Sequence, residues 1–426
     1  MKTTELISFI DSGALNKAFT DIYGQKNVEM QKARYIEAVK EFAKIYGDSD
    51  VTLFSVPGRS EISGNHTDHN FGEVLAGSID LDIIAVAAKT DDGVIKIKSK
   101  GFPEDVVDIR SYTSPDKNDF FTSRSIIAGM AKAFSDRELL TGGYVAYTTS
   151  NVFKGSGLSS SAAFEVMVGN ILNYFYNDGK VDNVEIAKMA QFSENVFFGK
   201  PCGLMDQMAC AVGGFVHIDF YNPKEPLIDK IDFNLTRAGY ALCIVNTGGN
   251  HADLNEDYAS VPAEMKSVAA HFGKATLSEL DMQQLLAEIK PLREKVGDRA
   301  IMRAAHFFKE NDRVEVQAAA LKKNDLETFL KLVMESGRSS FMFLQNVFTV
   351  KNIKEQGLSL ALCITDAVLS GTGATWRVHG GGFAGTIQAF VPREYVEYYR
   401  KAIDATFGEG ACHVLRIRPY GAIKVY

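Results

Sequence analysis

The 426-residue sequence has no excess of basic residues, and its formal net charge of −7 leaves no basic footprint for a nucleic acid. It has no run approaching the ~20 apolar residues that a membrane span requires, and its N-terminus lacks the apolar core of a signal peptide. Its five cysteines form no Cys-x-x-Cys pair, which favours reduced, mostly buried thiols. We therefore expect a cytoplasmic protein that binds neither nucleic acid nor membrane.

Familiar nucleotide-site and hydrolase signatures are absent as well. The P-loop pattern G-x-x-x-x-G-K-[ST] does not occur, so the chain is not a P-loop NTPase. The run 380–385 contains G-x-G-x-x-G, but the residues after it predict a strand, whereas a dinucleotide fingerprint must open a helix. No G-x-S-x-G elbow accompanies this run, which excludes an esterase site. The run is interpreted as a glycine hairpin whose backbone closes on a ligand or on another loop.

Helical and strand-like segments alternate along the chain, which predicts a mixed α/β fold. With 46% hydrophobic residues the chain can form a large core, and its length favours two domains over one. Helical periodicity covers 27–46, 164–175, 184–198 and most of 260–345, and strand-like runs cover 51–56, 74–88, 93–99, 215–220, 375–378, 386–391 and 414–417. Pro57-Gly58 is expected to end the first strand, and 223–226 is the best candidate boundary.

The most informative segment is a run of small residues and hydroxyls that leads into the apolar helix predicted over 164–175. Free N–H groups and the helix dipole at such an N-terminus favour a phosphate, and glycines let the backbone approach it. The serines can cap the helix or reach a phosphate or Mg²⁺, and a plain serine N-cap is the alternative. The segment consists of Gly155, Ser156, Gly157, Leu158, Ser159, Ser160 and Ser161.

A second cluster of charged and amide groups follows the first predicted strand. Asn65, His66 and Asp68 supply the paired donors and acceptors that vicinal hydroxyls need, and Arg59 suits a developing phosphoryl charge. This cluster is predicted to bind a polyol. The alternatives are a polar surface loop and, through His66, Asp68 and His69, a metal site.

A third candidate is Asp206, an acid among apolar and small residues in the run Cys202-Gly203-Leu204-Met205-Asp206-Gln207. A partly desolvated carboxylate there could orient or deprotonate a hydroxyl. The alternative is a helix-capping aspartate.

In this order, the segments resemble the motifs of the GHMP small-molecule kinases, and among these the galactokinase family. The run 64–75 is similar to the sugar-reading signature, 155–162 to the phosphate loop, and 380–385 to the third motif of these kinases. The run 202–207 matches the segment that carries the catalytic aspartate. The resemblance extends from about Phe19 to Tyr426.

This resemblance implies a two-domain α/β fold with mixed sheets and helices, with an N-terminal domain at 1–222, a C-terminal domain at 223–426 and the active site in the cleft between them. It implies an enzyme that transfers the γ-phosphate of ATP to the anomeric hydroxyl of galactose, with ATP and Mg²⁺ as cofactors. The partners are a small-molecule sugar and ATP. The oligomeric state is left open, with a monomer as one expectation.

The resemblance also assigns roles to single residues. Asp206 matches the catalytic aspartate and Arg59 its partner, and the sequence leaves open whether Asp206 removes the proton or only orients the hydroxyl. The implied sugar-binding residues are Arg59, Asn65, His66, Asp68, Gly203, Asp206 and Tyr258. The implied ATP-binding residues are Gly155, Ser156, Gly157, Leu158, Ser159, Ser160 and Ser161. Glu194 would hold Mg²⁺ together with Ser160 or Ser161.

The chain departs from the family pattern at several positions. Asn65 replaces the usual glutamate and His69 the usual tyrosine, and an amide donates as well as accepts hydrogen bonds. The only tryptophan is Trp376, so the segment 119–133 has none to flank adenine. Three other functions therefore stay open: a kinase for L-arabinose, galacturonate or N-acetylgalactosamine, a catalytically silent sensor of sugar and ATP, and a metal-dependent hydrolase.

Overall fold

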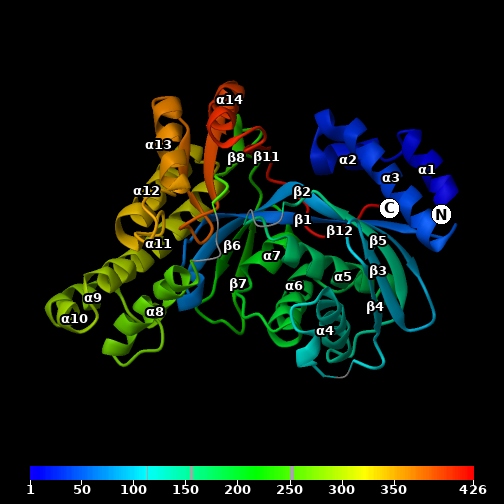
Figure 1. The fold of residues 1–426 in the computed structure, drawn as a ribbon, viewed down its shortest axis with the longest axis horizontal. Coiled ribbons are helices and arrows are strands. Elements are labelled where there is room, and N and C mark those ends of the chain that lie inside the picture. The colour runs from blue at the N-terminus through cyan, green and yellow to red at the C-terminus, as the bar shows by residue number, and fades with distance from the viewer. Residues whose placement is uncertain (113, 154–156, 250–253) are drawn as a thin grey trace.

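The computed structural model describes residues 1–112, 114–153, 157–249 and 254–426, which form two β-sheets covered by helices (Figure 1). Over these residues the first sheet has eight strands in the order β12-β1-β2-β5-β3-β4, with β6 pairing with β2 and β7 pairing with β6. Its pairs are antiparallel, except that β3 and β5 run parallel. The strands are β1 (Thr52–Ser63), β2 (Glu73–Lys89), β3 (Val94–Ser99), β4 (Glu104–Asp108), β5 (Tyr144–Ser150), β6 (Phe215–Asp219), β7 (Leu227–Ile231) and β12 (Ile423–Lys424).

Helices cover both faces of the first sheet because its long central strand buries alternate residues on opposite sides. In β2, Ile83 and Ala85 pack with α4 to α7, whereas Ile84 and Val86 pack with α1 to α3. Figure 1 shows these two helical layers on either side of the sheet. The helices are α1 (Thr3–Asp11), α2 (Asn16–Tyr23), α3 (Val28–Tyr46), α4 (Ser123–Ser135), α5 (Ser160–Tyr176), α6 (Asn183–Phe192) and α7 (Met205–Val212).

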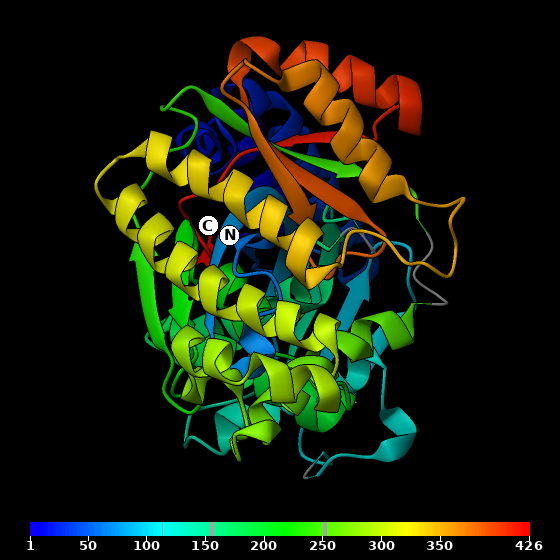
Figure 2. The ribbon, with the colours of Figure 1, turned by 90° about the vertical axis from the view of Figure 1, so that its left-hand side faces the viewer.

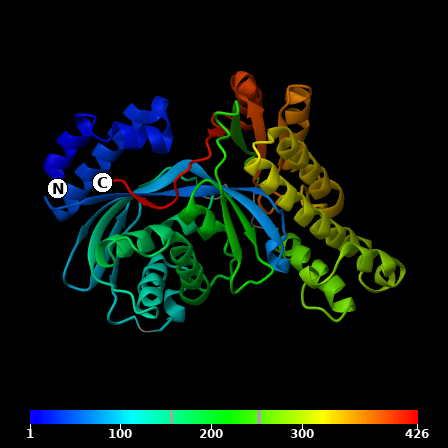
Figure 3. The ribbon, with the colours of Figure 1, turned by 180° about the vertical axis from the view of Figure 1, so that it is seen from behind.

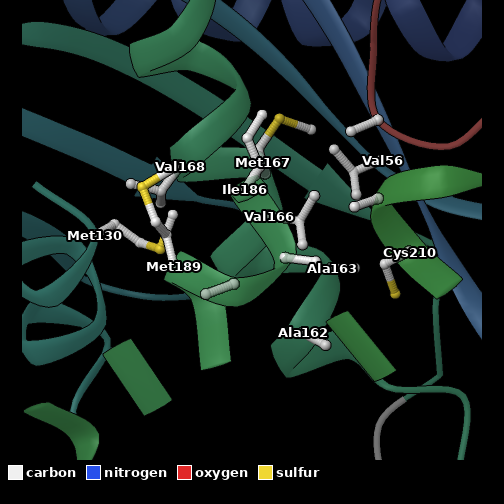
Figure 4. Packing of buried hydrophobic residues seen from close by; sticks show 14 of the residues in the cluster. Val56, Met130, Ala162, Ala163, Val166, Met167, Val168, Ile186, Met189 and Cys210 are labelled. Atoms are coloured by element: carbon white, nitrogen blue, oxygen red, sulfur yellow. The ribbon is translucent and has the colours of Figure 1, made fainter. Parts of the chain in front are cut away.

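Helix α5, which follows the serine-rich segment, is buried on nearly every face. Figure 4 shows Ala162, Val166 and Met167 of this helix packed among Met130 of α4 and Met189 of α6. This confirms the buried helix that its apolar sequence predicts. Because neighbours hold the helix on all sides, its N-terminus has a fixed position.

The second sheet has four antiparallel strands within the described residues, in the order β11-β8-β10-β9. Its strands are β8 (Tyr240–Asn246), β9 (Thr375–His379), β10 (Thr386–Pro392) and β11 (Cys412–Leu415). Strands β9 and β10 form a hairpin around the glycine-rich run 380–385. The predicted glycine hairpin is therefore confirmed, and the strand after it excludes a dinucleotide fingerprint.

Helices also cover both faces of the second sheet. In β8, Leu242 and Ile244 pack with α11 and α12, whereas Cys243 and Val245 pack with α13 and α14. Figure 2 shows the long helices α11 and α12 side by side in front of this sheet. The helices are α8 (Asn255–His271), α9 (Met282–Ala287), α10 (Ile289–Lys295), α11 (Asp298–Lys322), α12 (Leu326–Ser339), α13 (Gly357–Leu369) and α14 (Val396–Phe407).

Short helical turns connect these elements. The 3₁₀ turns are Gln25–Asn27, Asp68–Asn70, Lys117–Asp119, Leu277–Glu279 and Arg393–Tyr395, and the π-helical turns are Ser193–Phe198 and Ser340–Leu344.

The C-terminal segment returns to the first sheet, so that the two termini lie close together (Figure 3). The guanidinium of Arg418 reaches the fully buried carboxylate of Asp82, with 3.2 Å between Nη1 and Oδ2. Arg34 of α3 binds the same carboxylate at 2.6 Å. Burial alone would raise the pKa of Asp82, but the two guanidinium groups lower it. This ion cluster attaches both ends of the chain to β2.

The expectation that Pro57-Gly58 ends the first strand is wrong, because β1 continues to Ser63. A shift in the register of β1 against β2 between Pro57 and Arg59 accommodates the proline. Gly58 also allows a close approach, because a Cβ there would lie 2.7 Å from the carbonyl oxygen of Leu158. Arg59 therefore projects from a rigid strand instead of a loop.

The predicted boundary between residues 222 and 223 falls between β6 and β7, which pair with each other in the first sheet. The chain reaches the second sheet only at β8. The division into 1–222 and 223–426 stays a prediction.

Two expectations from composition can be compared with the structure. Three of the five free cysteines are buried, whereas Cys202 is half-buried and Cys363 is exposed. None of the helices in the described part of the chain is long and apolar enough to cross a bilayer.

Candidate active site

An ion pair between Arg59 and Asp206 lies where β1, α7 and the serine-rich segment meet. Nε and Nη2 of Arg59 both lie 2.7 Å from Oδ1 of Asp206. Nη1 of Arg59 donates to the carbonyl oxygen of Gly157. Burial alone would lower the pKa of Arg59, but the Asp206 carboxylate raises it above its ordinary value, so the guanidinium keeps its charge. The pair joins two of the predicted motifs.

Asp206 lies in the first turn of α7 but does not cap it, because the N-cap residue is Leu204. Its second oxygen, Oδ2, accepts a hydrogen bond from the hydroxyl of Ser159. Ser159 has a left-handed backbone with φ of 58°, and its side chain makes no capping bond to α5. Both capping alternatives are thus set aside, and a protein hydroxyl already binds the carboxylate predicted to receive a substrate hydroxyl.

Asp68 and Gly203 adjoin this ion pair. Oδ2 of Asp68 lies 3.0 Å from the position that a Cβ on residue 203 would take, so the absent side chain of Gly203 makes room for the carboxylate. Burial raises the pKa of Asp68, with Glu61 and Asp206 raising it further and His66 opposing them. The structure thus brings together Arg59, Asp68, Gly203 and Asp206, four residues predicted to bind the sugar.

Asn65 is fully buried, and its amide is engaged on all sides. Nδ2 donates to Glu61 at 3.1 Å and to the Gly380 carbonyl at 2.7 Å. Oδ1 accepts from Ser340 at 3.2 Å and from Asn346 at 2.8 Å. The side chain therefore connects the sugar loop to the glycine hairpin, and its predicted sugar contact would require one of these bonds to break. That contact stays a prediction.

His66 and Tyr258 both reach the glycine hairpin. Nε2 of His66 lies 2.9 Å from the carbonyl oxygen of Gly381, and the hydroxyl of Tyr258 donates to the carbonyl oxygen of Gly382 at 2.8 Å. Burial raises the pKa of Tyr258 to about 12, so its phenol stays protonated near neutral pH. The hairpin thus closes on another loop, one of the two outcomes that its sequence predicts.

The predicted phosphate loop is described only from Gly157 onward, because Gly155 and Ser156 lie outside the described residues. Gly157 has φ of +69°, and the buried Leu158 accepts the backbone N–H of Arg59 at 3.1 Å. Ser160 and Ser161 form the first turn of α5. The loop is thereby fastened to β1 and leads directly to the helix N-terminus.

A cavity of about 670 Å³ opens beside this N-terminus. Ser160 and Ser161 lie on one of its walls, and the apolar side chains of Phe102, Phe164 and Phe198 lie on others. Lys100 and Asp105 add a charge of each sign. The cavity combines a helix N-terminus with flat apolar surfaces, as a nucleotide site requires.

Glu194 is a buried carboxylate on the π-helical turn after α6. Its Oε1 lies 3.1 Å from Nζ of Lys200, and its Oε2 accepts a hydrogen bond from Gln207 at 2.7 Å. Gln207 also donates to Glu165 at 3.0 Å, whose pKa is raised by burial and then by Glu194. The sequence reasoning missed Lys200 and Gln207, although Gln207 directly follows Asp206.

Within the described ranges, no group of three or more His, Cys, Asp or Glu side chains could hold a metal ion. His66 and His69 instead contact each other, with 3.3 Å between Nδ1 and Nε2. Nothing in this geometry supports the metal-dependent hydrolase alternative.

Comparison with known proteins agrees with the geometry. Residues 125–214 match the N-terminal domain of GHMP kinases, and residues 40–89 match the galactokinase galactose-binding signature. The galactokinase of Glaesserella parasuis serovar 5 is 31% identical over 368 residues, covering 85% of this chain and 91% of its own length. The galactokinase of Clostridium tetani is 28% identical over 388 residues, covering 88% and 92%.

Solved structures of the same fold include that of Lactococcus lactis galactokinase complexed with galactose. It superposes with a TM-score of 0.74 at 24% identity, covering 90% of this chain and 98% of its own. The mevalonate kinase of Methanococcus jannaschii gives a TM-score of 0.60 at 15% identity, covering 86% and 98%. These likenesses confirm the predicted mixed α/β kinase fold. The chain belongs to the galactokinase family of GHMP kinases, which are phosphotransferases with an alcohol group as acceptor.

Proposed function

We propose that the protein transfers the γ-phosphate of ATP to the anomeric hydroxyl of D-galactose, giving galactose 1-phosphate and ADP. The match of residues 40–89 to the galactose-binding signature carries this proposal. The geometry supports it, because Asp68 of that segment lies against Gly203 and within electrostatic reach of Asp206. The curated relatives over most of the chain are named galactokinases.

Asp206 is proposed to receive the anomeric hydroxyl. Its Oδ2 accepts the Ser159 hydroxyl in this structure, and a sugar hydroxyl can take the same place. The guanidinium of Arg59 fixes Oδ1, which orients the carboxylate, and it adds positive charge where negative charge develops on the transferred group. Phosphoryl transfer depends on such positioning and charge neutralisation more than on covalent chemistry.

ATP is proposed to bind in the cavity beside α5. Its phosphates would approach Gly157, Ser160 and Ser161, where the N–H groups and dipole of α5 favour negative charge. Its adenine would lie against Phe102 or Phe198, since both line the cavity and Trp376 does not. Aromatic rings offer the flat apolar contact that a base needs.

Mg²⁺ is part of the proposal, and the residues present fit it. The buried Glu194 carboxylate already binds a cation, the ammonium of Lys200. Mg²⁺ commonly takes one or two protein ligands and completes its shell with water and substrate phosphates. Glu194 and the hydroxyl of Ser160 or Ser161 would hold it, and the ion would neutralise charge on the phosphate oxygens.

An ADP-release assay over a panel of sugars tests the proposal. We expect galactose to exceed glucose in kcat/KM by at least about tenfold, because a polar group left unpaired in a buried site weakens binding strongly. The panel includes L-arabinose, galacturonate and N-acetylgalactosamine, since Asn65 replaces the usual acidic residue. Phosphorus NMR should find the product phosphorylated at its anomeric oxygen. A clear preference for one of the rivals, or no sugar 1-phosphate from galactose, would contradict the proposal.

A further inference from the structure

The amide of Asn70 has a defined orientation. Its Oδ1 accepts the backbone N–H of Leu277 at 3.2 Å, and only the amide oxygen can accept that bond. Its Nδ2 therefore faces Nδ1 of His69, at 2.9 Å, and also lies 3.4 Å from the sulfur of Met265. Because Asn70 is fully buried, no water replaces these partners. Nδ1 of His69 must then accept a hydrogen bond.

This orientation fixes the proton on the next ring. Burial, and then the charge of His66, lower the pKa of His69 to about 3, so His69 is neutral at physiological pH. A neutral imidazole whose Nδ1 accepts carries its proton on Nε2. Nε2 of His69 lies 3.3 Å from Nδ1 of His66 and donates to it. Nε2 of His66 then donates to the carbonyl oxygen of Gly381 at 2.9 Å.

We propose that His69 is a positioning residue that places the proton of His66 on Nε2 and so makes His66 a fixed hydrogen-bond donor in the sugar site. The hydrogen bonds run in one direction, from Asn70 through His69 and His66 to the Gly381 carbonyl. A second proton on Nδ1 of His66 would face the N–H of His69, so the arrangement keeps Nδ1 as an acceptor.

A fixed donor restricts what His66 can recognise. The bond from Nε2 of His66 to Gly381 lies where solvent reaches it, so an incoming ligand can share or replace it. A sugar hydroxyl that binds this nitrogen must accept from it and donate its own proton elsewhere. The consequence for sugar recognition rests on the proposed function, whereas the proton positions do not.

The position of His69 distinguishes this chain from the family pattern, in which a tyrosine is usual. A tyrosine hydroxyl can also donate, but it has no second ring atom that receives a proton signal from Asn70. The relay from Asn70 is therefore a property of the histidine at this position.

Nitrogen-15 NMR of histidine-labelled protein, recorded without sugar or ATP, tests the proton positions directly. The chain has eight histidines, and spectra of His66→Gln and His69→Phe identify the two signals. We expect His69 and His66 both to be protonated on Nε2 only. In Asn70→Asp, the new carboxylate can only accept, so Nδ1 of His69 should become protonated. His271→Phe removes a histidine whose hydrogen-bond partner is Glu288, and it should leave both signals unchanged.

Steady-state kinetics test the consequence for the sugar. His69→Phe removes one neutral hydrogen bond to His66 and should raise KM for galactose between about two- and tenfold, with KM for ATP unchanged. His69→Tyr differs from His69→Phe by one hydroxyl and should recover part of the loss.

Two results would overturn the proposal: a proton on Nδ1 of His69 in the wild-type protein, or a His66 signal that is the same in wild-type and His69→Phe proteins. Asn70→Asp supplies an independent reading should His69→Phe not fold. Absence of galactose phosphorylation would remove the proposed function and leave the NMR result standing.

Discussion

Arg59 holds Asp206 by a single carboxylate oxygen: two guanidinium nitrogens lie 2.7 Å from Oδ1, and Oδ2 is left to a hydroxyl. The third nitrogen of Arg59 binds the Gly157 carbonyl, so the same side chain connects the acid to the phosphate loop. A shift of the loop is thereby transmitted to the carboxylate. The acid and the loop are expected to act as one unit in catalysis.

Replacing Asp206 by asparagine should abolish most turnover while preserving the fold. The substitution removes the charge with almost no change in volume, and losing such a group commonly lowers a rate by a factor on the order of 10² to 10⁴. ADP release measures the effect, and calorimetric titration with a non-hydrolysable ATP analogue should show retained binding. Near wild-type turnover would remove Asp206 from its proposed role.

Gly157→Val should weaken ATP binding far more than sugar binding. Gly157 has φ of +69°, a conformation that a β-branched residue adopts only with strain. A Cβ there would lie 3.5 Å from the His379 ring, which is an ordinary contact, so the backbone and not a clash is the cause. Gly273→Val is the matched control, since Gly273 has φ of +70° in open space. Equal ATP affinity in the two variants would argue against a phosphate role for the loop.

Asp68→Asn should impair sugar binding selectively. The carboxylate lies against Gly203, and charge-assisted hydrogen bonds to hydroxyls contribute about 1.5–3 kcal/mol each, so KM for the sugar should rise at least about tenfold. KM for ATP should stay near the wild-type value. Asp91→Asn, in an exposed turn, serves as the control. An equal rise in both KM values would point to a general disturbance of the site instead of a sugar contact.

The sequence predicts the fold best where one pattern decides the structure. The apolar run 74–88 becomes β2, and the apolar helix after Ser161 becomes α5, because burial on both faces leaves no other arrangement for such residues. It predicts β1 poorly, since Pro57-Gly58 reads locally as a break. Only the register with β2 and the close approach of Leu158 explain why the strand continues.

For the site, the sequence identifies residue types but not their partners. Arg59 and Asp206 are 147 positions apart, and their pairing depends on how α7 packs against β1. Asn65 looks like a free polar side chain in the sequence, whereas its partners Ser340 and Asn346 come from the far end of the chain. Such contacts arise from tertiary packing, which no local pattern encodes.

Asp80 provides a test of stability against pH. It accepts the backbone N–H of Arg416 at 3.0 Å, and burial raises its pKa from 3.8 to about 6. The folded state therefore binds this proton more tightly than the unfolded state does. The contribution of Asp80 to stability falls as the pH rises from about 4 to about 6, and it stays unfavourable above that range.

Asp80→Asn should consequently stabilise the protein near neutral pH, because the amide oxygen can still accept the Arg416 N–H and no buried charge remains. The pKa difference corresponds to about 2 to 3 kcal/mol, and partial exposure of the side chain reduces the expected gain to about 1–2 kcal/mol. Urea unfolding at pH 7.5 and at pH 4 measures it, and the gain should vanish at the lower pH, where the wild-type carboxyl is itself protonated. Asp91→Asn, whose side chain is exposed, should show no such pH-dependent difference. A gain of equal size at both pH values would mean that the substitution acts through packing and not through the charge of Asp80.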